Sequence, residues 1–141
     1  MKEAPEFEIK SISLFESTAI RYEGVSRAPG MEVEVSLENE NGDYLDGELE
    51  CRSICSVTIR NGAEEFALFI SHFRPIFTVD READFTAGTP VGDALNDEVL
   101  RQVYPYHRQL VADMMSRMNL PVFTLPLLSD KMLVSGSSGR E

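Results

Sequence analysis

The sequence predicts an α+β fold in which a four-stranded antiparallel sheet is followed by a long, proline-interrupted helix and a short C-terminal helix. Apolar residues alternate with polar ones at strand period up to about residue 79, and they recur at helical spacing from about residue 90. An Asn-Gly pair at 61 and 62 is typical of a tight hairpin between two of the strands. We expect one domain over residues 1–134, followed by a flexible Ser/Gly tail over 135–141.

The first two strands have clear apolar patterns. The first contains Phe7, Ile9, Ile12 and Leu14, and the slip in phase between 9 and 12 predicts a β-bulge. The second covers residues 31–37, where apolar and polar residues alternate strictly, as they do when one face of a strand is buried. Asn and Gly residues within 38–43 then predict a reversal of the chain.

The third and fourth strands are expected over residues 48–60 and 65–79, joined by the Asn61-Gly62 turn. Because Pro75 has no N–H, we expect it to break the ladder or to place its segment at an edge. Taken in order, these strands predict an antiparallel meander.

Helical spacing begins after Thr89, which is a candidate N-cap, and Pro90, which suits the first helical position. Pro105 interrupts the pattern, so it either kinks one long helix or starts a second. Pro121 ends the stripe, and a short helix is expected over 129–134.

Charge and targeting signals exclude several classes of function. With 13 Lys and Arg against 24 Asp and Glu, the net charge is −11, which repels phosphate backbones, so we expect no nucleic-acid partner. The sequence contains neither a signal-peptide apolar region at its start nor an apolar run long enough to span a membrane. We therefore expect a cytoplasmic protein without membrane insertion.

The residues that could carry chemistry are few. Cys51 and Cys55 lie four apart on a strand, about 13 Å between Cα atoms, which is too far for a disulfide and favours free, buried thiols. His72 is expected at a strand edge or rim, and His107 is expected to face solvent. No spacing indicates a metal or nucleotide site, so we expect no cofactor and no enzyme. An enzyme whose site is assembled in an oligomer from His72, Cys51 or Cys55 is a remaining alternative.

Two surface features suggest partners. Glutamates at Glu8, Glu32 and Glu34 should lie opposite the apolar stripes and could dock a basic partner. The helix and the segment after it carry more apolar residues than one helix face can readily bury, which suggests an oligomer interface or an apolar groove. The interface candidates are Tyr106, Leu110, Met114 and Met118.

Residues 103–109, the methionines of 114–118 and the proline-containing apolar run 120–127 together resemble the helix and exit segment of the SecB protein-export chaperone family. The resemblance extends over roughly residues 7–128. It implies a homotetramer, a dimer of dimers, that holds unfolded preproteins and passes them to the SecA motor without nucleotide or metal. It also implies an apolar client groove that accepts many sequences.

The resemblance assigns roles to individual positions. Val33, Val35 and Leu37 match the floor of the family's client groove, and Tyr44 and Leu45 fall in the connection that overhangs it. Further groove candidates lie near the closing C-terminal segment, at Leu127, Leu128 and Met132. Of the acidic SecA-docking positions, one matches Glu16, whereas two others are occupied by Ile20 and Ile70.

The sequence therefore predicts a SecB-like chaperone for unfolded polypeptides that are destined for export. The first alternative is a dedicated chaperone for one partner, such as the antitoxin of a toxin-antitoxin pair, because this would explain the altered SecA positions.

Overall fold

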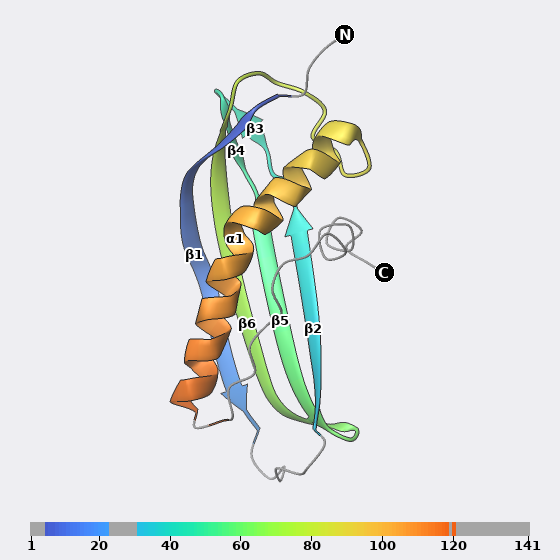
Figure 1. Ribbon diagram of the computed structural model, residues 1–141, viewed down its shortest axis with the longest axis vertical. Coiled ribbons are helices and arrows are strands. Elements are labelled where there is room, and N and C mark those ends of the chain that lie inside the picture. Colours follow the sequence, from blue (N-terminus) through green and yellow to red (C-terminus); the bar gives the residue numbers. More distant parts are fainter. Residues whose placement is uncertain (1–4, 23–30, 119, 121–141) are drawn as a thin grey trace.

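The computed structural model describes residues 5–22, 31–118 and 120. A twisted antiparallel sheet is crossed on one face by a long helix (Figure 1). The elements are β1 (Phe7–Arg21), β2 (Glu32–Glu40), β3 (Tyr44–Leu45), β4 (Glu48–Glu50), β5 (Arg52–Asn61), β6 (Glu64–Val79) and α1 (Pro90–Arg117). The expected short helix at 129–134 and the tail at 135–141 lie outside the described residues.

The sheet has six strands, not four, because the strand expected over 48–60 is interrupted and forms β4 and β5, and the short strand β3 was not expected. β4 and β5 pair with β6 in one continuous register, as Glu50 faces Ile76 and Ser53 faces Phe73. Between them the Cys51 N–H donates to the Pro75 carbonyl, at 2.9 Å. Pro75 has no N–H with which to return this bond, so the ladder breaks where the sequence predicted it.

A second interruption separates β2 from β3 at residues 41–43. Gly42 lies so close to the neighbouring strand that an added Cβ would overlap the Glu50 carbonyl. The reversal into β4 is made by Asp46 and Gly47, which both have positive φ (52° and 80°), as a tight turn between twisted strands requires. The expected reversal within 38–43 is therefore a break in a strand, and the turn lies a few residues further on.

The expected meander is wrong in one connection. β1 pairs with β6 and not with β2, so the chain crosses from one edge of the sheet to the other between its first two long strands. The predicted bulge is confirmed by a register shift between Ile9 and Ser11, and a second shift lies between Leu14 and Glu16. The alternation of apolar and polar residues does not determine strand order, because it shows which face of a strand is buried but not which strand pairs with it.

The hairpin between β5 and β6 is confirmed one residue further on than expected. Asn61 pairs with Glu64, and the turn is made by Gly62, with φ 64°, and Ala63. The glycine is needed because the left-handed conformation is unfavourable for residues with a Cβ.

α1 begins as the sequence predicts and continues through Pro105 as one helix. The Thr89 side chain accepts the Gly92 N–H at 3.0 Å, and Pro90 occupies the first helical position. Pro105 is solvent-exposed, on the side of the helix away from the sheet. The buried face of α1 joins two core clusters, one around Leu100 and Tyr104 and the other around Val99 and Val103.

Alternation along β5 and β6 divides the sheet into two faces. Along β5, and along β6 from Ala67 on, the odd-numbered residues, such as Val57 and Phe69, are buried under α1, and we call this the covered face. The even-numbered residues of the same segments, such as Ile54 and Ile70, point to the other side, which no element of the described chain packs against; we call this the open face.

Replacing Gly42 by Ala should lower the free energy of unfolding by about 2 kcal/mol or more, because the new methyl group collides with rigid backbone of β4. Urea unfolding measures this change. The matched control is Gly62→Ala, where the space is open and only the cost of positive φ applies, about 1 kcal/mol. Wild-type stability in Gly42→Ala would contradict the close approach of these strands.

Candidate functional site

An apolar row follows the edge strand β2 on the covered face. Val33, Val35 and Leu37 each pair with a β5 residue that is in the core. Val33 and Leu37 are half-buried against the core cluster beneath α1, whereas the side chain of Val35 is 41% exposed. The row therefore offers apolar surface beside the helix without being fully buried in the described chain.

The two residues predicted to overhang this row lie on different faces. Tyr44 pairs with the buried Leu49 and stacks on Phe85, with 5.9 Å between ring centroids and 26° between planes. Leu45 pairs with Glu48 on the open face and is 72% exposed. The structure thus brings Tyr44, but not Leu45, to the side of the β2 row. The remaining groove candidates, Leu127, Leu128 and Met132, lie outside the described residues.

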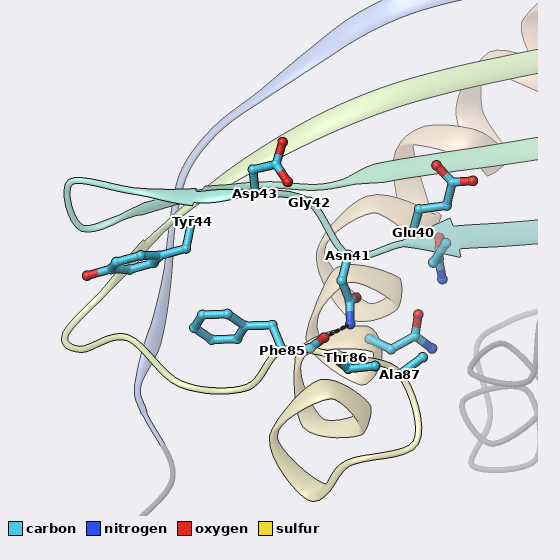
Figure 2. Close-up of a pocket in the computed structure, with 10 residues that line it drawn as sticks. Glu40, Asn41, Gly42, Asp43, Tyr44, Phe85, Thr86 and Ala87 are labelled. Carbon is cyan, nitrogen blue, oxygen red and sulfur yellow. Dashed lines mark hydrogen bonds between the residues drawn. The ribbon is translucent and has the colours of Figure 1, made fainter.

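A pocket of about 540 Å³ lies at the end of the β2 row, between the β2–β3 connection and the loop that leads into α1 (Figure 2). Its lining residues are Asn39, Glu40, Asn41, Gly42, Asp43, Tyr44, Phe85, Thr86, Ala87 and Asn96. Figure 2 shows the Asn41 amide donating to the Phe85 carbonyl, which ties the two walls together. Sequence reasoning missed this pocket. The one available signal was that Asn39 continues the phase of the apolar row, with a polar side chain where an apolar one is expected.

The four acidic docking candidates all lie on the open face. They are Glu8, Glu16, Glu32 and Glu34, whose partners across the ladder are Thr78, His72, Arg60 and Thr58. Arg60 bonds to Glu34 at 2.7 Å and lies 3.4 Å from Glu65, so part of this acidic charge is already compensated. Ile20 and Ile70 lie on the same face, which is therefore mixed and not uniformly acidic.

The second bulge of β1 places an aromatic side chain over the open face. The ring of Phe15, which is 57% exposed, lies 4.8 Å from the His72 ring, and the Arg74 guanidinium lies 3.5 Å above it. The sequence suggested that His72 lies at a strand edge or rim, but it is buried on the central strand β6. Burial, with the nearby Arg74 charge, lowers the pKa of His72.

The oligomer-interface candidates differ in exposure. Tyr106 is 48% exposed and Leu110 and Met118 are half-buried, whereas Met114 is in the core of the single chain. Met114 therefore has little surface to offer a second copy. A pocket of about 410 Å³ between β1 and α1 is lined by Leu14, Phe73, Tyr106, Gln109, Leu110 and Asp113.

His107 is fully buried, which corrects the expectation that it faces solvent. Its ring lies between two serines of the covered face, with Nε2 3.0 Å from the Ser53 hydroxyl and Nδ1 bonded to that of Ser71. Burial lowers its pKa from 6.5 to about 3, so the ring is neutral near pH 7. The sequence could not reveal this contact, because the serines that satisfy the ring come from distant strands.

The chemistry-bearing residues of the enzyme alternative do not meet within one chain. Cys51 and Cys55 are buried and free, as predicted, and burial raises the pKa of their thiols to about 11 and about 12, so both are protonated near pH 7. They belong to the covered face, whereas His72 belongs to the open face. Within residues 5–22, 31–118 and 120, His, Cys, Asp and Glu form no group that could hold a metal ion. Within the same ranges, no helix is both long enough and apolar enough to cross a membrane.

Comparisons with known proteins identify solved structures that share this architecture. No protein-family model matches the chain, and no curated protein matches its sequence. Among solved structures, the Mycobacterium tuberculosis SecB-like chaperone Rv1957, in complex with a ChAD peptide from the Rv1956 HigA1 antitoxin, superposes with a TM-score of 0.71 at 25% identity, over 87% of this chain and 91% of that one. A Streptococcus agalactiae protein of unknown function reaches a TM-score of 0.49 at 13% identity, over 89% of this chain and 100% of that one.

The buried His107 predicts a dependence of stability on pH. Its native pKa is depressed, so below about pH 6.5 the unfolded chain takes up a proton that the native chain refuses until about pH 3, and stability falls as the pH falls. Between pH 7.5 and pH 5 this loss is about 2 kcal/mol.

The variant His107→Gln cannot titrate, and its amide can hydrogen-bond to both serines. Its free energy of unfolding should therefore fall about 2 kcal/mol less than that of wild type over the same pH range, whatever its stability at pH 7.5. Urea unfolding at a series of pH values measures the two slopes. Parallel curves would contradict a neutral, buried imidazole.

Proposed function

We propose that this SecB-like chain is a chaperone that binds non-native polypeptide segments along the β2 row on the covered face. The observation that carries the proposal is the structural likeness to a SecB-like chaperone in complex with a peptide, over most of both chains. The exposed Val35, between the half-buried Val33 and Leu37, supports the proposal. It provides apolar surface on β2, the strand that matches the floor of the client groove in the SecB family.

The geometry of β2 suits an extended ligand. Among the described strands β2 pairs only with β5, so its outer edge carries backbone donors and acceptors that a client strand could use. Burial of client side chains against the apolar row contributes about 25 cal/mol per Å² whatever their order. Backbone pairing and apolar burial together need no particular sequence, which is what a holding chaperone requires.

Assembly and delivery to SecA form the finer part of this proposal. Exposed apolar side chains on α1 and β1, Tyr106 and Leu14 among them, would be covered in a homo-oligomer built as a dimer of dimers. The open face, with Glu8, Glu16, Glu32 and Glu34, would dock SecA. Ile20 and Ile70 on that face reduce its acidity, so we expect this contact to be weak and less sensitive to salt than a uniformly acidic one.

A second candidate is a chaperone dedicated to one antitoxin. It is favoured by the solved neighbour, which is in complex with a peptide from an antitoxin. The antitoxin segment would bind along the same β2 row, and the residues at the ends of the row would determine selectivity.

Substitution of Val35 by Asp tests the proposed row directly. A charge in the row should weaken binding of reduced, carbamidomethylated ribonuclease A, which cannot refold, by about tenfold or more, because it removes roughly 1.5 kcal/mol or more of apolar burial. Fluorescence anisotropy gives the Kd. The control is Ser36→Asp, which adds the same charge to the adjacent residue on the opposite side of β2. Equal Kd values for the two variants would contradict this location.

Cross-linking in the native cell extract distinguishes the two candidates. A general chaperone should yield many unrelated, aggregation-prone proteins at comparable levels, whereas a dedicated one should yield a single dominant partner. Each pattern should disappear in Val35→Asp and persist in Ser36→Asp. A titration of purified SecA, at low and high salt, tests the export role separately, and absence of binding at low salt would remove it.

A further inference from the structure

The pocket at the end of β2 contains side-chain amides without hydrogen-bond partners. Both amide atoms of Asn39 and the Nδ2 of Asn96 are buried and unpaired. The Asn96 side chain comes from α1 and is only 5% exposed. Asn41, by contrast, is already bonded to the Phe85 carbonyl (Figure 2).

Such unpaired atoms are unfavourable unless something binds them. Leaving a buried donor or acceptor unsatisfied costs the free energy of its desolvation with no hydrogen bond in return, and native proteins contain few of these groups. Here unpaired atoms from two separate elements converge on one pocket of about 540 Å³. This convergence indicates a ligand that supplies the missing partners.

The chemistry of the pocket selects the class of ligand. Asn39 offers an NH2 group that donates and an oxygen that accepts, and both are matched by a group that accepts and donates, such as a peptide main-chain unit. A phosphate or carboxylate could only accept, and Glu40 and Asp43 in the lining would repel it. An ammonium group could only donate and would leave the Nδ2 donors unpaired.

The position of the pocket agrees with an extended chain. Asn39 follows Val33, Val35 and Leu37 on the same face of β2, at the two-residue spacing of roughly 7 Å that an extended ligand shares. Beyond it, the stacked rings of Tyr44 and Phe85 form an apolar wall that could receive one ligand side chain.

We propose that Asn39 and Asn96 bind the main chain of an extended client segment at the end of the apolar row, with the adjacent client side chain against Tyr44 and Phe85. This inference rests on the proposed function, and it adds a polar, main-chain-reading subsite to an otherwise apolar groove. The subsite would fix the position and direction of the client segment without reading its sequence.

The variants Asn39→Leu and Asn96→Leu test the subsite, because leucine has a similar size and no amide. Each should weaken binding of reduced, carbamidomethylated ribonuclease A about tenfold, while the midpoint of urea unfolding stays the same or rises, since an unsatisfied group has been removed. The control, Ser36→Leu on the open-face side of β2, should leave the Kd unchanged.

The outcomes separate the subsite from the proposed function. If wild type binds the unfolded ribonuclease and both leucine variants bind it equally well, the subsite is wrong and the chaperone function stands. A marked drop in the unfolding midpoint of the variants would also overturn it, because it would mean that the amides are satisfied within the fold. If wild type does not bind, both proposals fail together.

A second measurement does not depend on the variants folding. A peptide of about 12 residues from the tightest-binding region of the ribonuclease is synthesised as a series in which one main-chain nitrogen at a time is methylated. Methylation at positions that pair with β2 should weaken binding to wild type and to Asn39→Leu alike. At one or two further, adjacent positions, we expect methylation to weaken binding to wild type tenfold or more. At those positions methylation should not weaken binding to Asn39→Leu. A series that loses affinity identically with both proteins would overturn the subsite.

Discussion

The central strand β6 determines the arrangement of the other elements. It pairs with β1 along one side and with β4 and β5 along the other, so its sixteen residues set the register of the whole sheet. From Ala67 on, its alternating side chains assign the paired residues of its neighbours to the covered or the open face. A one-residue slip would exchange the buried Phe69 and Phe73 with Ile70 and Arg74, and the sheet would lose its contact with α1.

Several features of this arrangement follow from the sequence, because they depend on local chemistry. The Thr89 cap depends on the hydrogen bond that its hydroxyl accepts, and the Pro90 start and the ladder break at Pro75 depend on the fixed φ and missing N–H of proline. The bulge after Ile9 follows from the slip in phase of the apolar pattern. The buried, unpaired state of Cys51 and Cys55 follows from strand period alone.

Other features depend on contacts between distant residues and were therefore not predictable. The pairing of β1 with β6 in place of β2 depends on which edge is available once the sheet forms. His107 is buried because Ser53 and Ser71 satisfy its ring, and neither serine is near it in sequence. The pocket at the end of β2 likewise combines Asn39, at the end of a strand, with Asn96 of α1, a helix that begins roughly fifty residues later. Only the fold brings these two amides together.

The division of the sheet into two faces suggests a division of function. On the covered face, the β2 row ends in a pocket with unpaired amides, which suits an extended chain. The open face carries glutamates such as Glu16 and Glu34 together with apolar residues such as Ile20, a mixture that suits a folded partner better than an unfolded one. A chaperone with this arrangement could hold a client on one side while a partner docks on the other.

The most direct test of this account is a calorimetric titration of reduced, carbamidomethylated ribonuclease A into the purified protein at several temperatures, with folded ribonuclease A as the control. We expect binding of the unfolded form only, with a negative heat-capacity change from burial of apolar surface. Absence of binding, or equal binding of the folded form, would contradict the claim that this chain recognises non-native polypeptide.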